Sequence, residues 1–389
     1  MSIRKPLTIM VSAGEPSGDA LGAGLISELR RLHPGVRIVG VGGPAMRSEG
    51  LVSFFDIAEI AVMGIAEVLP KIRTIFRRMR QVAEFALRVK PDVVVLIDSG
   101  DFHHRVARRI KAADRSIPIV KYVSPQVWAS RPGRAAGMKD YLDHILCLLP
   151  FEPAFYEPYG LPSTFVGHPA LERAASIKGG AALRMQLGIS DGAKVLCVLP
   201  GSRRVEVTHL LPAFKAAAAR VKAAVPDLVC VLPTVKNVEA LVRAGVSDWP
   251  TPLHVLTEPN QRLAAFDMAD AALAASGTVT TELAIAGVPM VVAYKVGAVT
   301  AAIWKRLVTV AHVTIANLVI GRRAVPEFIQ EQVTPEALSS AVIPLLTDPD
   351  AIAAQKAALA AAVGKLGTNN EGPSRLAAEA VLRIAGGKA

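Results

Sequence analysis

The chain of 389 residues is longer than a single compact core normally grows, so two domains of ordinary size are expected. Hydrophobic residues make up 51% of the chain, yet its longest stretch without a formal charge, Leu307–Gly321, is shorter than the roughly 20 apolar residues of a membrane-spanning helix. The net charge of +11 favours an anionic partner, while an aromatic content of 5% and the lack of a nucleic-acid-binding signature argue against nucleic acid as that partner.

The N-terminus resembles a secretion signal only in part. Arg4 and Lys5 precede a short apolar run that leads directly into the polar turn Gly14–Asp19, without a cleavage site. We therefore expect a first strand and turn there, and a chain that stays in the cytoplasm. Each of three cysteines lies within an apolar run, which predicts buried free thiols in place of disulfides or a metal cage: Cys147, Cys197 and Cys230.

Short apolar runs alternate with helical stretches throughout, which is typical of parallel strands joined by helices. In the first half, the predicted strands are Leu7–Val11, Arg37–Val41, Asp92–Ile97, Ile117–Val123 and Ile145–Leu149. In the second half they are Val195–Leu199, Leu228–Leu232, Leu253–Leu256, Ala271–Ala274 and Met290–Ala293. The sequence thus predicts an α/β protein with two doubly wound, Rossmann-like domains that face a cleft.

The boundary between the two domains is expected near residue 170. A Phe-Val-Gly-His-Pro turn leads there into a small, polar stretch, so residues 1–170 are predicted to form the first domain and residues 171–345 the second. Residues 346–389 are rich in alanine and predict helices that pack across domains or subunits.

Residues 62–89 combine apolar side chains at helical spacing with a basic flank. An ordinary helix that covers a sheet has a similar pattern, but the density of arginine favours a helix that lies on a membrane surface among anionic phospholipids. Pro70 suggests a break in this helix. The predicted membrane contacts are Val68, Leu69, Ile72, Phe76, Arg77 and Arg78.

Open α/β sheets bind ligands at the carboxyl ends of their strands, which makes the turns after the strands candidates for chemistry. The first such turn offers glycines and backbone N–H groups at a helix start, although a plain helix cap has the same pattern. Its candidate binding residues are Gly14, Glu15, Ser17 and Gly18.

Two aspartates follow the buried strand that ends at Ile97. A carboxylate at such a strand end is a natural general base for a sugar hydroxyl. Asp98 is the first choice and Asp101 the second, because Asp101 can instead cap the next helix. His103 and His104 offer a metal or proton-relay pair, but adjacent side chains on a helix point apart, so no metal site is predicted.

Two turns in the second half predict a nucleotide-diphosphate pocket. Gly201 and Ser202 offer backbone donors and Arg203 a fork suited to phosphate oxygens, although a solvated basic turn has the same composition. Ser276, Gly277 and Thr278 precede or open a helix that can receive a diphosphate. Glu282 can accept hydrogen bonds from ribose hydroxyls, or simply interact favourably with the helix dipole.

Seven segments, in order and over nearly the whole chain, resemble the lipid-A-disaccharide synthases. They are Ala13–Asp19, Gly42–Met46, Val62–Leu69, Tyr122–Ala129, Leu199–Val207, Ala275–Glu282 and Pro326–Phe328. The resemblance implies a glycosyltransferase-B-type fold, a UDP-2,3-diacylglucosamine donor, a 2,3-diacylglucosamine 1-phosphate acceptor, a β-1,6-linked product and no cofactor. It also implies a peripheral protein on the cytoplasmic face of the inner membrane, and it is compatible with a homodimer.

The resemblance further implies residue roles. Asp98 matches the essential aspartate of the family, Arg203 its diphosphate-contacting arginine, and Glu282 and Asn317 its nucleotide-side residues. The sugar or acceptor side also includes Met63, Gly64, Ser124 and Gln126. The chain departs from the family pattern at three positions, where the family usually has Asn, Trp and Pro: His103, Ser130 and Ala316.

The expected mechanism is a single displacement. Asp98 takes the proton of the acceptor's 6-hydroxyl, while Arg203 and backbone N–H groups offset the charge that grows on UDP, so the anomeric centre inverts. Another UDP-sugar enzyme of this fold is the main alternative, either the transferase that builds the lipid intermediate of peptidoglycan or a UDP-N-acetylglucosamine 2-epimerase. A dinucleotide-dependent oxidoreductase is disfavoured by the missing G-x-G-x-x-G. A non-catalytic lipid-binding protein would leave the Asp98 and Arg203 turns without a role.

Overall fold

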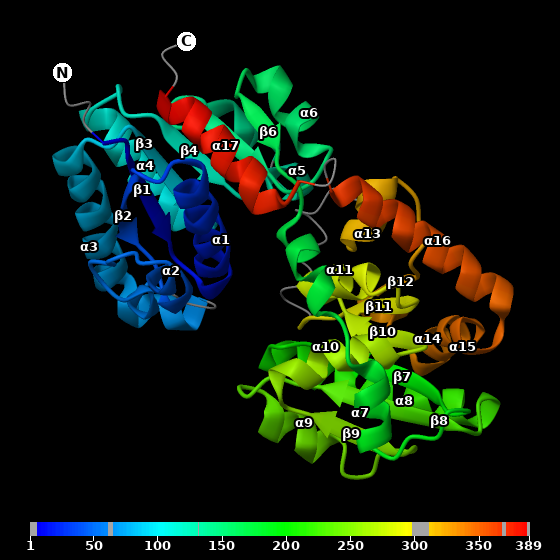
Figure 1. The fold of residues 1–389 in the computed structure, drawn as a ribbon. Helices are drawn as coiled ribbons and strands as arrows, with labels where there is room; N and C mark the ends of the chain where they lie inside the picture. Colours follow the sequence, from blue (N-terminus) through cyan, green and yellow to red (C-terminus); the bar gives the residue numbers. More distant parts are fainter. Residues whose placement is uncertain (1–5, 61–64, 131, 298–310, 368–370, 387–389) are drawn as a thin grey trace. The chain divides into compact units, whose positions relative to one another are not determined.

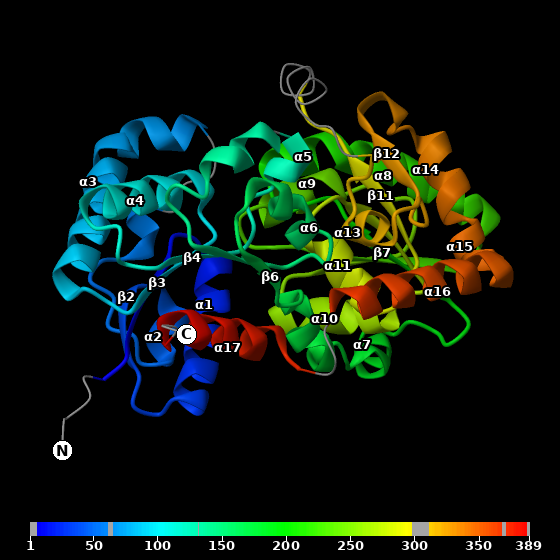
Figure 2. The same ribbon diagram turned by 90° about the horizontal axis from the view of Figure 1, so that it is seen from above.

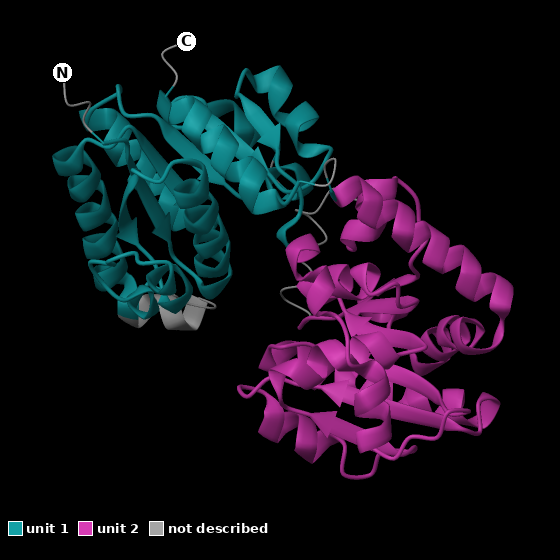
Figure 3. Ribbon diagram, in the orientation of Figure 1, with its two compact units in different colours: residues 1–169, 367–389 teal, residues 170–366 magenta. Residues whose placement is uncertain are grey.

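A computed structural model describes residues 6–60, 65–130, 132–297, 311–367 and 371–386. The chain forms two compact units (Figure 3). Unit 1 comprises Met1–Pro169 and Gly367–Ala389, and unit 2 comprises Ala170–Leu366. The C-terminal tail is therefore shared between the units, since α16 (Pro349–Leu366) belongs to unit 2 and α17 (Pro373–Gly386) to unit 1.

Unit 1 is built on a parallel six-stranded sheet in the order β2-β1-β3-β4-β5-β6 (Figures 1 and 2). Its strands are β1 (Thr8–Ala13), β2 (Arg37–Val41), β3 (Val93–Ile97), β4 (Ile119–Tyr122), β5 (His144–Cys147) and β6 (Ser163–Phe165). Its other helices are α1 (Pro16–Leu32), α2 (Pro44–Ser48), α3 (Ile65–Val89), α4 (Gly100–Ala113), α5 (Val127–Ser130) and α6 (Glu152–Tyr156), with short 3-10 turns η1 (Ile57–Glu59), η2 (Pro132–Gly137) and η3 (Glu157–Tyr159).

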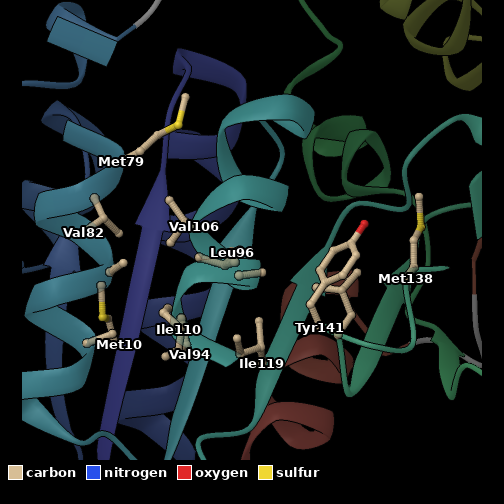
Figure 4. Packing of buried hydrophobic residues seen from close by; sticks show 14 of the residues in the cluster. Met10, Met79, Val82, Val94, Leu96, Val106, Ile110, Ile119, Met138 and Tyr141 are labelled. Carbon is tan, nitrogen blue, oxygen red and sulfur yellow. The ribbon is translucent and has the colours of Figure 1, made fainter. Parts of the chain in front are cut away.

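Both faces of this sheet are covered by helices, because alternate residues of each strand point to opposite sides. On one face, Met79 and Val82 of α3 and Val106 of α4 pack against Met10 and Leu96 (Figure 4). On the other face, α1 and α17 pack against each other and cover the remaining strand residues, such as Ile9 and Val95. The carboxyl ends of β1 and β3 thereby reach the same edge of the sheet.

Unit 2 repeats this architecture with the strand order β12-β11-β10-β7-β8-β9, again all parallel. Its strands are β7 (Lys194–Leu199), β8 (Leu228–Pro233), β9 (Leu253–Leu256), β10 (Ala271–Ala275), β11 (Met290–Tyr294) and β12 (Glu327–Ile329). Its helices include α7 (Gly180–Gln186), α8 (Arg204–Ala224), α9 (Glu239–Gly245), α10 (Pro259–Met268), α11 (Thr278–Ile285), α13 (Ile315–Ile320), α14 (Pro335–Val342) and α15 (Pro344–Thr347), with η4 (Pro169–Ser176) and η5 (Gln330–Gln332).

The predicted strands are all present, with ends shifted by a few residues. The two strands that were not predicted, β6 and β12, have three residues each and lie at sheet edges. The expected break at Pro70 is wrong, because the described part of α3 runs without interruption from Ile65 to Val89. Pro70 lies in its second turn, where the helix loses the one hydrogen bond that proline cannot donate and then continues.

Two further sequence predictions concern the cysteines and membrane-spanning helices. The three cysteines are free and buried, as predicted. Among the residues that the structure describes, no helix combines the length and the apolar character needed to cross a membrane.

Candidate active site

Asp98 lies in a strained turn directly after β3. Both Asp98 and Ser99 have left-handed backbone conformations, with φ of 52° and 49°. Such a conformation costs about 1–3 kcal/mol for a residue other than glycine and persists only where surrounding contacts hold it. The Asp98 carboxylate accepts a hydrogen bond from the Ser17 hydroxyl at 3.0 Å. The predicted base is thus held at the carboxyl end of the sheet, beside the start of α1.

The glycines of the β1–α1 turn allow this close approach. A Cβ on Gly14 would lie 2.3 Å from the Ser99 hydroxyl oxygen, and one on Gly18 would lie 3.3 Å from the Ile97 carbonyl oxygen. The Ser99 hydroxyl lies 3.5 Å from Glu15 Oε1. The structure therefore brings the four candidate residues of this turn next to the Asp98 turn.

A buried carboxylate, Asp19, ties this turn to the next strand end. It accepts hydrogen bonds from the backbone N–H groups of Gly43, Ala45 and Met46 at 2.7, 2.9 and 3.0 Å, and it is 4% exposed. Asp19 thus holds the start of α2, which has no side-chain cap of its own. The sequence pattern alone does not predict this role for Asp19.

The second candidate base, Asp101, is placed differently from Asp98. Its side chain is 87% exposed, and its carboxylate lies 3.8 Å from Arg134. It is the second residue of α4, which begins at Gly100, so it interacts favourably with the helix dipole. The hydrogen bond from Ser17 places the Asp98 carboxylate, unlike that of Asp101, beside the start of α1.

The remaining acceptor-side candidates have different surroundings. The buried Ser124 hydroxyl lies 3.0 Å from the Tyr156 hydroxyl, so it stabilises the loop after β4, whereas Gln126 is exposed. Nearby, Glu152 accepts from the Trp128 indole at 3.0 Å, and burial raises the pKa of its carboxyl. Two further candidates lie outside the described residues: Met63 and Gly64.

Unit 2 contains a cavity of about 370 Å³ at the carboxyl ends of β7, β8 and β10. We refer to it as the unit 2 cavity. Seven of the predicted nucleotide-side residues line it: Gly201, Ser202, Arg203, Ser276, Gly277, Thr278 and Glu282. The first turn of α11 opens onto this cavity, and the first backbone N–H groups of a helix have no partner within the helix. The cavity therefore has the chemistry of an anion site.

Glu206 positions the Arg203 side chain at the unit 2 cavity. The Arg203 Nη1 atom lies 2.8 Å from Glu206 Oε1, while Glu206 Oε2 accepts from the backbone N–H groups of Ser202 at 3.0 Å and Arg203 at 3.2 Å. The Arg203 side chain remains 65% exposed. Gly201 is required here, because its φ is 115° and a Cβ would lie 2.4 Å from Glu206.

Two arginines that sequence reasoning missed also line the cavity. Arg262 and Arg173 lie 3.2 and 3.4 Å from Glu282 Oε1, and the Glu282 side chain is 8% exposed. Their positions in α10 and η4 carry no motif, so only the fold brings them together. The cluster adds positive charge at the cavity and fixes the Glu282 carboxylate.

Comparisons with known proteins identify the family. Residues 9–381 match the protein family described as lipid-A-disaccharide synthetase. The chain belongs to the lipid-A-disaccharide synthase family. The lipid-A-disaccharide synthase of Rhodospirillum centenum is 45% identical over 98% of this chain and 95% of its own length, and that of Ruegeria pomeroyi is 47% identical over 97% and 95%. The chain is therefore an enzyme of the glycosyltransferase class, as predicted.

Solved structures show the same fold at low sequence identity. A UDP-N-acetylglucosamine 2-epimerase from Neisseria meningitidis, bound to UDP-GlcNAc, aligns over 97% of this chain and 99% of its own with a TM-score of 0.64 and 13% identity. MurG from Acinetobacter baumannii aligns over 97% and 100% with a TM-score of 0.58 and 16% identity. The predicted glycosyltransferase-B-type fold class is confirmed.

Asn317, a nucleotide-side residue implied by the family resemblance, is buried and hydrogen-bonded to the backbone in the structure. It is fully buried in α13 and is not among the described residues that line the unit 2 cavity. Its amide donates to the Val325 carbonyl at 2.8 Å and accepts from the N–H groups of Ala324 and Val325 at 2.8 and 2.9 Å. Its side chain is thus engaged by the backbone that leads into β12.

We expect Asn317→Ala to lower the thermal midpoint of unit 2. The substitution leaves the N–H groups of Ala324 and Val325 without their buried acceptor, and each unsatisfied buried group costs about 1–3 kcal/mol. Thermal unfolding followed by circular dichroism measures the change, and UDP affinity measured at a temperature well below the transition separates stability from binding. An unchanged midpoint would contradict the structural role.

The chain departs from the family pattern at three positions, and the structure describes the surroundings of each. His103 is fully buried, and its ring bonds the Asp98 carbonyl at 2.8 Å and the Ser12 hydroxyl at 3.0 Å. Ala316 is buried in α13, and Ser130 is half-buried at the end of α5.

The predicted membrane-contact residues divide into two groups. Ile72 and Phe76 are large apolar side chains with 41% and 42% exposure, and the Arg77 side chain is 60% exposed. Arg78 is turned into the protein: its guanidinium contacts Glu59 at 2.6 Å and lies over the Phe55 ring. Its assignment to the membrane surface is therefore corrected. The side chains of two further residues lie outside the described ones: Val68 and Leu69.

Proposed function

We propose that the chain condenses UDP-2,3-diacylglucosamine with 2,3-diacylglucosamine 1-phosphate. The products are the β-1,6-linked disaccharide 1-phosphate and UDP. The family match over residues 9–381 carries this proposal, because it covers both the Asp98 turn of unit 1 and the unit 2 cavity. Both groups of residues that the proposed reaction uses thus lie within the matched region.

The unit 2 cavity is the proposed site of the UDP group. The Arg203 guanidinium and the N–H groups at the start of α11 supply charge-assisted donors for diphosphate oxygens. As the bond between C1 of the donor and the diphosphate oxygen breaks, negative charge develops on that oxygen. Donors fixed in advance stabilise this charge in the transition state more than in the ground state.

Asp98 is the proposed general base. The acceptor's 6-hydroxyl loses its proton to the Asp98 carboxylate as its oxygen attacks C1 from the face opposite UDP, so a new glycosidic bond forms and the anomeric configuration inverts. The hydrogen bond from Ser17 orients the carboxylate for this step.

Mass spectrometry of the product tests the reaction. The purified protein is incubated with both acylated glucosamines, and we expect a disaccharide 1-phosphate and one equivalent of UDP. Soluble UDP-N-acetylglucosamine without the acylated acceptor serves as the control substrate. Because an epimer has the same mass as its substrate, the control reaction is followed by proton NMR, and an isomeric UDP-sugar there would identify an epimerase and contradict the proposal.

We further propose that α3 lies on the anionic cytoplasmic face of the inner membrane. Exposed Ile72 and Phe76 supply apolar contact and Arg77 supplies charge for phospholipid headgroups. Both proposed substrates carry acyl chains, whose extraction into water costs about 0.8 kcal/mol per CH₂. A membrane-bound enzyme avoids most of this cost. The homodimer stays a prediction.

Phe76→Ser is expected to weaken binding to vesicles of phosphatidylglycerol about tenfold. The substitution removes roughly half of the free energy that burial of a whole aromatic side chain supplies, because about that part of the side chain is exposed to the membrane. Co-sedimentation with the vesicles measures the partition. Met185→Ser is the matched control, because Met185 is 80% exposed in unit 2. Equal partition of Phe76→Ser and the parent protein would reject this surface.

A further inference from the structure

A chain of buried polar groups lies directly beneath the Asp98 turn. Ser12 of β1 and His103 of α4 are 0% exposed, and Lys121 of β4 is 1% exposed. These residues come from three separate elements and meet at the carboxyl ends of β1, β3 and β4, where the neighbouring strand residues are apolar. Burial of an ammonium group is unfavourable unless hydrogen bonds replace its water, so this position requires an explanation.

The polar groups converge on one backbone oxygen. The Lys121 ammonium donates to the Asp98 carbonyl, and the His103 ring contacts the same carbonyl at 2.8 Å. Lys121 also lies 3.4 Å from the Leu96 carbonyl. Burial lowers the pKa of His103 to about 3, so its ring is neutral and its Nδ1–H donates while Nε2 accepts from Ser12.

These donors act on the residue with the unfavourable backbone. The carbonyl of Asp98 belongs to the peptide between the two left-handed residues Asp98 and Ser99. Hydrogen bonds to that carbonyl fix the direction of the peptide, and the direction of the peptide determines where the Asp98 side chain leaves the strand end. Burial lowers the pKa of Lys121 to about 7. The nearby carboxylates of Asp98 and Glu15 interact with the Lys121 charge and oppose this lowering.

We propose that Lys121 is a positioning residue for the reaction: by holding the Asp98 carbonyl from below, it keeps the carboxylate of the general base in its reactive orientation. Lys121 is too deeply buried to contact a substrate itself. The inference rests on the proposed role of Asp98 as the base. It assigns a function to a buried lysine that the mechanism otherwise does not use.

A second buried lysine of unit 1 provides a matched control. Lys111 in α4 is 8% exposed and contacts Asp143 at 2.8 Å and the Arg115 carbonyl at 3.0 Å. It lies at the other end of α4 from the Asp98 turn. Replacement of either lysine by methionine removes a buried ammonium of the same kind, so a purely structural effect appears in both variants.

The test compares Lys121→Met and Lys111→Met by steady-state kinetics, UDP binding calorimetry and thermal unfolding. We expect Lys121→Met to lower kcat about 100-fold, as for a reacting group displaced by about 1 Å, with KM for the donor and Kd for UDP unchanged. Lys111→Met is expected to lower the thermal midpoint and to keep the parent kcat. Lys121→Gln, which retains a neutral N–H donor, is expected to recover part of kcat, and it replaces Lys121→Met if that variant does not fold.

The double variant with Asp98→Asn separates this inference from the proposed function. Once the carboxylate is gone, Lys121→Met should lower kcat no further. A parent-like kcat in folded Lys121→Met, or an equal additional loss in the Asp98→Asn background, would overturn the positioning role and leave the proposed reaction intact. A parent-like kcat in Asp98→Asn would reject the base, and the positioning role with it.

Discussion

Asp98→Asn is expected to lower kcat by about 10²- to 10⁴-fold, the contribution of a well-placed general base. The amide has nearly the shape of the carboxylate and can still accept the Ser17 hydrogen bond, but it cannot take a proton from the acceptor hydroxyl. The thermal midpoint and the Kd for UDP should stay close to those of the parent protein. Product formation from both acylated substrates, measured under saturating conditions, reports kcat.

Asp101→Asn is the control for this substitution. Asp101 lies three residues further along the same segment, and its side chain is 87% exposed beside Arg134. We expect it to retain most of the parent activity. The reverse result, with an active Asp98→Asn and an inactive Asp101→Asn, would transfer the role of the base to Asp101.

Arg203→Ala is expected to lower kcat by about 10²- to 10³-fold, the usual loss when one donor to a developing oxyanion is removed. UDP should also bind more weakly, because the diphosphate loses a charged partner at the unit 2 cavity. Arg203→Lys should recover only part of the loss, since an ammonium keeps the charge without the planar fork. Calorimetry with UDP and steady-state kinetics measure the two effects separately.

Arg204→Ala is the matched control for Arg203. Arg204 is the next residue in the chain and is exposed at the start of α8, but it is not among the described residues that line the cavity. Removal of its charge changes the net charge of the protein by the same amount. If both variants weakened UDP binding equally, the effect of Arg203 would be one of overall charge, and its assignment to the diphosphate would fail.

The turn that carries Arg203 and the turn that carries Asp98 both depend on backbone conformations that few residues adopt. Gly201 has a φ of 115° and leaves space for the Glu206 carboxylate that holds Arg203. Asp98 has no such freedom, so contacts from Ser17, His103 and Lys121 surround it. The two turns therefore maintain their unusual backbone conformations by different means: the Gly201 turn through a glycine, and the Asp98 turn through a buried polar network.

Local pattern in the sequence determined the strands, the fold class and the turns at the strand ends. Apolar runs such as Val93–Ile97 form buried strands because both faces of a parallel sheet are covered. Asp98 and Arg203 follow such runs directly, so their location at the carboxyl end of a sheet was predictable. The seven family-like segments, read in order, also identified the family that the comparisons confirm.

Only the tertiary structure decided what depends on residues far apart in the chain. The edge strands β6 and β12 are too short for a periodic signal and form because a neighbouring strand offers hydrogen bonds. The helical pattern assigned Arg78 to the membrane, but Glu59 holds it against the protein. Neither Arg262 nor Lys121 lies in a motif that indicates its role. Their contacts with Glu282 and Asp98 follow from parallel strands and helices that bring distant residues to one edge of a sheet.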